Sequence, residues 1–207
     1  MLNFKTIIMK NTIKATSLLA LLFMVACSSE EAEKIIEEPV SERVEYVYNG
    51  SQDLINATTS VDIEIHDDAI IIDPTKVTLQ IRFKHDKAVD VDYGYIAPGA
   101  EEEFIAVGLG GSNKYNANNT LSFNSTNTEI IGDSYPDQTI PEGNYTSGSS
   151  FINDPLLHEA PLFKSLLNKN IKGVWVFFFY EFGNTQSGQI RSVKLIFEEG
   201  ALEVNDI

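Results

Sequence analysis

Cysteine, tryptophan, histidine and basic residues are all scarce in this chain of 207 residues. Its single cysteine leaves no disulfide within the chain, so the fold must be held by packing. Acidic residues outnumber basic ones 30 to 15, and the resulting net charge of −15 repels polyanions. We therefore exclude nucleic acid as a partner. The three histidines form no H-E-x-x-H motif or Cys/His cluster, so no zinc site is expected.

The chain also lacks an apolar run of the roughly 20 residues that a membrane-spanning helix needs. Its most apolar stretch, 15–26, follows three lysines and ends at the sole cysteine, Cys27. This order is typical of a secretory signal. The tetrad Met24-Val25-Ala26-Cys27 resembles the lipobox of bacterial lipoproteins. That resemblance implies removal of residues 1–26, acylation of Cys27 and a lipid anchor in the outer membrane. An ordinary signal with a spare thiol and an uncleaved anchor are the alternatives.

Composition divides the rest of the chain into three parts. Residues 27–42 are acidic and poor in apolar residues, which predicts a disordered tether. This acidic start resembles the export tags of surface lipoproteins, and a plain spacer is the alternative. Residues 43–200 form the predicted folded domain, and residues 201–207 are predicted to be a short tail.

Apolar and polar residues alternate through much of the predicted domain. Strands are expected near 61–65, 77–83, 91–97, 103–109, 120–123, 173–182 and 189–198, separated by turns rich in glycine, asparagine and proline. One helical turn or two is expected near Leu162–Leu167. This pattern predicts an all-β protein, and we favour a jelly-roll β-sandwich because that arrangement limits open sheet edges.

The segment from Lys172 to Phe197 gives the most specific fold signal. Its motif Gly173-Val174-Trp175-Val176-Phe177-Phe178-Phe179-Tyr180-Glu181, followed by Gly188, Leu195 and Phe197, resembles the closing hairpin of the P domain, also called P/Homo B. Further matches are the strand that ends in His85, the stretch from Asp90 to Pro98, and the stretch from Pro161 to Asn170. The resemblance covers roughly residues 60–198.

The P domain is a galactose-binding-like jelly roll that usually follows a subtilisin-like serine endopeptidase and stabilises it. The resemblance therefore implies a core that contains Trp175, and an association with proteolysis without a catalytic domain in this chain. The match departs from the family at Glu181, where the family has aspartate, and at Val193, where it has a second tryptophan. Any role of the family's acidic residues is in doubt here.

Residues for nucleophilic catalysis are poorly placed in the sequence. Ser147, Ser149 and Ser150 lie in a Gly/Ser stretch without a G-x-S-x-G elbow. His66 and His85 have acidic neighbours, but adjacent strand residues point to opposite faces. We therefore predict no catalytic residue and no enzymatic activity.

Aspartates near strand ends raise the question of calcium. Asp90 and Asp92 are two residues apart and share a strand face with Asp86 nearby, which is a candidate set of hard oxygen ligands. A second set consists of Asp67, Asp68 and Asp73. Hydrated acids on an acidic surface, with no cofactor, are the simpler interpretation of both sets.

The strand at 173–181 is apolar on both of its faces. Val174, Val176, Phe178 and Tyr180 alternate with the predicted core residues. Two interpretations stay open: other residues cover this second face, with Tyr46, Tyr48 and Phe151 as candidates, or Val176, Phe178 and Tyr180 belong to a binding surface.

The leading functional hypothesis is therefore a non-catalytic, membrane-anchored module that binds an exported protease or another surface protein. The alternative is a carbohydrate-binding jelly roll. Such a module needs exposed aromatic platforms, for which the sequence offers Tyr93, Tyr95, Tyr115 and Tyr135.

Overall fold

The computed structural model describes residues 42–55, 58–86, 91–106, 119–129, 131, 139–146, 162–181 and 187–204. Strands dominate this part of the chain, and its helical structure is two short 3₁₀ turns, η1 (Pro74–Lys76) and η3 (Lys164–Leu166). The strands are β1 (Val44–Ile55), β2 (Thr58–Ile65), β3 (Ala69–Ile71), β4 (Val77–His85), β5 (Val91–Ile96), β6 (Glu102–Ala106), β7 (Thr120–Phe123), β8 (Gly143–Tyr145), β9 (Gly173–Glu181), β10 (Ser187–Phe197) and β11 (Leu202–Val204).

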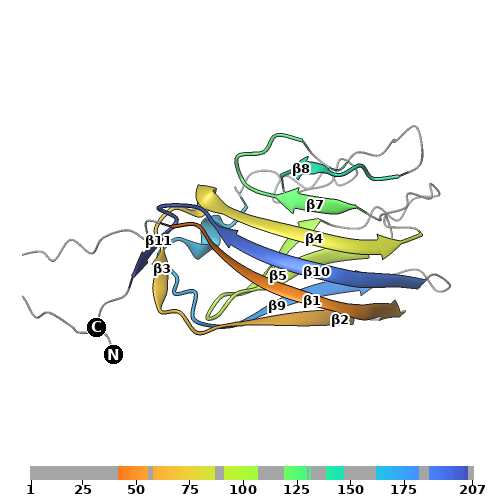
Figure 1. Ribbon diagram of the computed structural model, residues 1–207, viewed down its shortest axis with the longest axis horizontal. Coiled ribbons are helices and arrows are strands. Elements are labelled where there is room, and N and C mark those ends of the chain that lie inside the picture. The colour runs from red at the N-terminus through yellow and green to blue at the C-terminus, as the bar shows by residue number, and fades with distance from the viewer. Residues whose placement is uncertain are drawn as a thin grey trace, which may run out of the picture. The chain divides into compact units, whose positions relative to one another are not determined.

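These strands form two main sheets and one small one (Figure 1). The first sheet has the order β1-β10-β4-β7-β8, the second β2-β9-β5-β6, and a short ladder pairs β11 with β3. Neighbouring strands are antiparallel except for β7 and β8, which run parallel. The four-stranded sheet is called the β9 sheet below, and the five-stranded one the β10 sheet.

The core lies between these two sheets. Aromatic rings from both sheets meet there: Phe83 of β4 lies 6.2 Å from Phe179 of β9, and Trp175 of β9 lies 6.3 Å from Phe197 of β10. All four side chains are buried at 1% exposure or less. Large rings bury much apolar area at a low entropic cost, which suits a domain without disulfides. The predicted all-β sandwich is confirmed.

Most predicted strands are found within three residues of their expected positions. Trp175, Phe177, Phe179, Leu195 and Phe197 face the core as predicted. The helical turn near Leu162–Leu167 is the single 3₁₀ turn η3.

Two short segments differ from the predictions. Residues 202–204 were assigned to a tail but form β11, which pairs with β3 and buries Leu202. The expected turn that contains Gly143 is the start of β8, which extends the β10 sheet beside β7. Both strands have three residues, too few to show a period of two in the sequence.

Candidate binding face

The outer face of the β9 sheet is the surface that the sequence singles out. The central strand β9 turns Trp175, Phe177 and Phe179 into the core and its alternate residues away from it. Along this outer face Val176 lies opposite Ile96 of β5, and Phe178 lies opposite Gly94. Val174 is 47% exposed, and Val176, Ile96 and Tyr180 are partly exposed. We call Val174, Val176, Tyr180 and Ile96 the apolar row.

Phe178 is the exception in this row, because only 3% of its surface is exposed. A Cβ on Gly94 would lie 2.4 Å from the Phe178 ring and 2.2 Å from the backbone oxygen of Glu103. Glycine therefore lets the ring settle against β5. The ring of Tyr180 packs on Phe178 with 5.1 Å between centroids. Phe178 thus belongs to the support of the face more than to its exposed part.

Tyr180 is held across the face by a carboxylate of β6. Its hydroxyl donates a hydrogen bond of 2.9 Å to Glu102 Oε1. Glu102 pairs with Ile96, whereas Tyr180 pairs with Asp92, so the tyrosine side chain leans along the strands to reach it. The hydrogen bond, with burial and the negative charge of Glu102, raises the pKa of Tyr180. The phenol therefore stays protonated and keeps its position as the pH rises.

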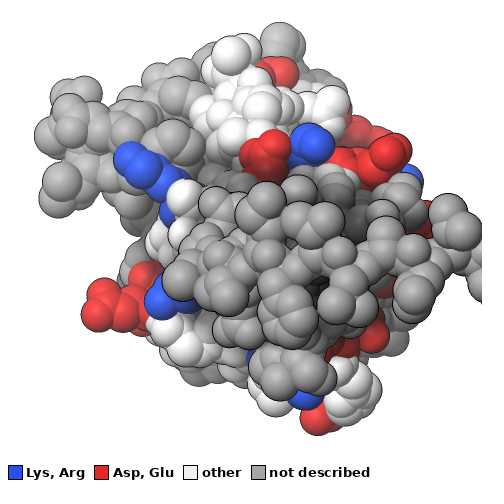
Figure 2. Space-filling view, turned by 90° about the vertical axis from the view of Figure 1, so that its left-hand side faces the viewer, with Lys and Arg blue, Asp and Glu red and all other residues white. Residues whose placement is uncertain are grey.

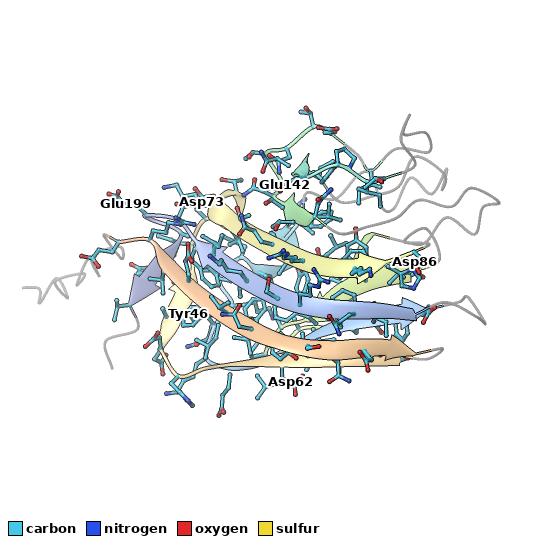
Figure 3. All side chains as sticks on the ribbon, turned by 45° about the vertical axis from the view of Figure 1, so that its right-hand side comes forward. Tyr46, Asp62, Asp73, Asp86, Glu142 and Glu199 are labelled. Carbon is cyan, nitrogen blue, oxygen red and sulfur yellow. The ribbon has the colours of Figure 1, made fainter. Side chains whose placement is uncertain are left out.

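Carboxylates border the apolar row on two sides. On β2, Asp62 pairs with Val176 and Glu64 pairs with Val174, and both acids are exposed. Figure 3 shows Asp62 along the β2 side of the molecule. On the other side lies Glu102 of β6, which is also exposed. The apolar row therefore has an acidic border, which we call the acidic rim: Asp62, Glu64 and Glu102.

The two described residues that were candidates to cover this face lie elsewhere. Tyr46 and Tyr48 belong to β1, an edge strand of the opposite sheet. Tyr46 packs edge-on against Phe197, 6.1 Å away, and donates a hydrogen bond of 2.6 Å to Asp67. The cover assigned to these two tyrosines is therefore wrong. The third candidate, Phe151, lies outside the described residues.

The candidate calcium ligands are only partly described. Asp86 is exposed in the turn after β4, Asp92 is buried on β5 at 7% exposure, and Asp90 lies outside the described residues. Within the described part of the chain, no three His, Cys, Asp or Glu side chains gather into a metal-binding group. The calcium site at Asp86, Asp90 and Asp92 stays a prediction.

The second candidate calcium set has structural roles instead. Asp68 accepts hydrogen bonds from Asn170 at 2.7 Å and Lys172 at 3.0 Å. Asp73 caps the turn η1 by accepting from the backbone N–H of Thr75. Figure 2 shows the end of the molecule that carries β3 and β11, where described acidic and basic side chains are intermixed.

One histidine has a carboxylate partner that the sequence did not reveal. His85 Nε2 lies 3.2 Å from Glu181 Oε1, and both side chains are fully buried. The partners are 96 residues apart and end strands in opposite sheets, so spacing gave no signal. Because the imidazole is enclosed, it does not reach a substrate. His66 is exposed on a loop, and His158 and Ser147, Ser149 and Ser150 lie outside the described residues.

The proposed sugar platforms divide in the same way. Tyr93 and Tyr95 are buried core residues with 3% and 0% exposure, so neither offers a ring to a carbohydrate. Tyr95 stacks on Trp175 with 6.0 Å between centroids. The use of Tyr93 or Tyr95 as platforms is therefore wrong, while Tyr115 and Tyr135 lie outside the described residues.

The membrane-related predictions concern residues that the structure does not describe. Cys27 and the residues 1–41 around it lie outside the described part of the chain. Within that part, no helix has the length and apolar character to span a bilayer.

Neither a protein-family model nor the sequence of a curated protein matches this chain. Among solved structures, the fold is similar to the crystal structure of a serine protease of Aeromonas sobria, with a TM-score of 0.39 and 9% identity over 79% of this chain. It is also similar to the crystal structure of the complex between Aeromonas sobria serine protease and the chaperone ORF2, with a TM-score of 0.35 and 10% identity over 79% of this chain. In both cases the match spans 28% of the other chain. Similarity at this level assigns neither family nor function.

Proposed function

We propose that this protein is a non-catalytic binding module, held at the outer membrane by a lipid on Cys27, which binds another exported protein through the outer face of the β9 sheet. The observation that carries this proposal is the apolar row with its acidic rim. Val174 and Val176 stand on a face that points away from the core, in a strand whose other face is fully buried. Partly exposed apolar side chains grouped in this way favour a protein interface.

The rim indicates the chemistry of the partner. Asp62, Glu64 and Glu102 surround apolar groups on a chain whose net charge is −15. Matching charges steer association and select among partners, so the partner is expected to present apolar side chains inside a basic border. The P-domain resemblance over residues 60–198 supports an exported protease as this partner, with the module in an accessory role.

The test compares two valines of similar exposure on opposite sheets. Val174 of β9 is 47% exposed, and Val47 of β1 is 40% exposed. A photo-reactive residue is placed at either position in the full chain, and cross-linking is carried out in intact cells. We expect one exported protein to be cross-linked from position 174 and not from position 47.

The cross-linked protein is then identified, purified and titrated against variants. Val174→Glu should weaken binding at least about tenfold, because it places an unpaired charge among apolar groups, whereas Val47→Glu should leave it unchanged. Replacing Asp62 and Glu64 by lysine should slow association, with a smaller effect at high salt. Equal cross-linking at both positions, none at position 174, or equal loss from the two glutamates would contradict the proposal. Peptide hydrolysis by the purified chain would contradict its non-catalytic part.

A further inference from the structure

The β10 sheet contains two irregularities at the same level, and both involve Arg191. The pairing of β10 with β4 shifts between Ile190 and Ser192, so Arg191 has no partner residue on β4. The pairing of β1 with β10 shifts between Asn49 and Gln52, again opposite Arg191. A β-bulge bends a strand and re-aims its side chains, and such bulges are over-represented beside functional sites. Here two of them lie on either side of the central strand.

A pocket lies directly beyond these bulges on the sheet. It has a volume of about 230 Å³ and is lined by Asp53, Lys84, Asp86, Gly188, Gln189 and Arg191. We call it the Arg191 pocket. Asp86 places it at the end of the molecule opposite Asp73 and Glu199 (Figure 3). It belongs to the β10 sheet, so it is separate from the apolar row.

The register of the strands fixes the order of the charges. Gln189 of β10 pairs with Asp53 of β1 on one side and with Lys84 of β4 on the other. All three are at least partly exposed on the side of the sheet away from the core, and Gln189 Nε2 donates to Asp53 Oδ1 at 3.4 Å. An anion and a cation therefore stand on the two sides of a neutral amide. Asp86 and Arg191 add one charge of each sign to the same lining.

Ion pairs neutralise charges elsewhere on this sheet but do not involve the lysine of the pocket. Lys194 of β10 lies 2.7 Å from Glu45 of β1. Among the ion pairs of the described residues, none includes Lys84 or Asp86. Both side chains are exposed. They are therefore available to a ligand.

The balance of charge selects the class of ligand. A metal ion would meet Lys84 and Arg191, and a simple anion would meet Asp53 and Asp86. A ligand that carries both an ammonium and a carboxylate satisfies each sign at once, through charge-assisted hydrogen bonds. Two strand spacings separate the backbones of Asp53 and Lys84 by about 10 Å. A hydrogen bond of about 3 Å at each end leaves about 4 Å between the ligand's charges.

We propose that the Arg191 pocket binds a free α-amino acid, with the ammonium toward Asp53 and Asp86 and the carboxylate toward Lys84 and Arg191. The two charges of an α-amino acid have the short separation that the register requires. The volume equals that of roughly eight water molecules, which is enough for an amino acid with a small or medium side chain. The proposal does not rest on the proposed function, because it concerns the opposite sheet.

Glycine and its two fragments are the probes. Acetate carries only the carboxylate of glycine, and methylammonium only the ammonium. The isotope-labelled full chain, purified in detergent, is titrated with each at constant ionic strength, and amide resonances are followed by NMR. We expect glycine to shift the resonances of Gly188 and Gln189 in a saturable way. Acetate and methylammonium should bind at least about tenfold more weakly, since each loses one set of charged hydrogen bonds.

Charge-neutral variants test the assigned roles. Lys84→Gln and Asp53→Asn should each weaken glycine binding about tenfold without changing the unfolding midpoint, because both residues are exposed. Lys194→Gln, on the same sheet but outside the pocket, is the matched control and should not change it. Equal binding of acetate and glycine would reveal an anion site, and equal binding of methylammonium a cation site. Either result, an absence of saturable shifts, or equal effects of Lys84→Gln and Lys194→Gln would overturn the proposal.

Discussion

Replacing Trp175 with phenylalanine tests what holds the sandwich together. The indole is fully buried, and its Nε1–H donates a hydrogen bond of 2.9 Å to the carbonyl of Ile171. It stacks on Tyr95 and meets Phe197 edge-on. Ile171 in turn donates to the backbone oxygen of Ala69 in β3. One side chain therefore connects the core with the segment that leads into β9.

Two losses determine the size of the effect. Phenylalanine cannot donate to the Ile171 carbonyl, and an unsatisfied buried carbonyl costs about 1–3 kcal/mol. The smaller ring also leaves a void, which costs about 1–2 kcal/mol in a core that cannot fully collapse. We expect the free energy of unfolding to fall by about 2–4 kcal/mol. With a slope of about 2 kcal/mol per molar urea, the unfolding midpoint moves down by about 1–2 M.

Urea unfolding of the full chain, followed by far-ultraviolet circular dichroism, measures this difference. Val174→Ala is the control on the same strand, and it should cost less than about 0.5 kcal/mol because Val174 is half exposed. Trp175 is the only tryptophan, so native fluorescence adds a direct check. We expect weak quenching by acrylamide. A loss below about 1 kcal/mol in Trp175→Phe, or quenching as strong as that of free tryptophan, would refute the reasoning.

Three further predictions concern other parts of the chain. Glu181→Ala removes the carboxylate partner of the buried His85, so urea unfolding should show a loss of about 2–4 kcal/mol, whereas Glu181→Gln should lose less; equal stability of Glu181→Ala and the wild type would exclude a structural role for the pair. Burial, with the charge of Glu103 and a hydrogen bond to it, raises the pKa of Tyr95 above its ordinary value of 10.0. The folded state keeps this proton while the unfolded chain loses it, so stability should fall as the pH rises above about 10, and Glu103→Gln should reduce this fall. Cys27→Ala should abolish labelling by radioactive palmitate and release the protein from the membrane fraction, and unchanged labelling would disprove acylation at this residue.

The sequence predicted those parts of the fold in which the burial pattern is long and local. β4 alternates buried and less buried residues over nine positions, and the core face of β9 follows from Trp175 and its alternate neighbours. β3, β8 and β11 have three residues each, and their pairing depends on strands distant in sequence. No local pattern specifies such contacts, so these strands were missed.

The candidate face was predicted in part for the same reason. The alternation in β9 identified Val176, Phe178 and Tyr180, but not the strands that lie beside them. Glu102 reaches Tyr180 from a strand 78 residues away in sequence. Gly94, inside a strand pattern, was a usable signal, because an isolated glycine there often marks a close approach of another group. The Arg191 pocket gave no signal, since it depends on two bulges in separate ladders.

The two proposed surfaces belong to opposite sheets, and one buried contact connects the sheets near the pocket. Gly188, which lines the Arg191 pocket, pairs with His85, and a Cβ at this glycine would lie 2.3 Å from His85 Cδ2. His85 in turn contacts Glu181 at the end of β9, whereas Val174 lies near the start of that strand. Because rigid packing holds β9 in place along its length, an occupied pocket has no evident way to reshape the apolar row. We therefore expect the two surfaces to bind their ligands independently, which is the property of a tethered module that presents two separate sites.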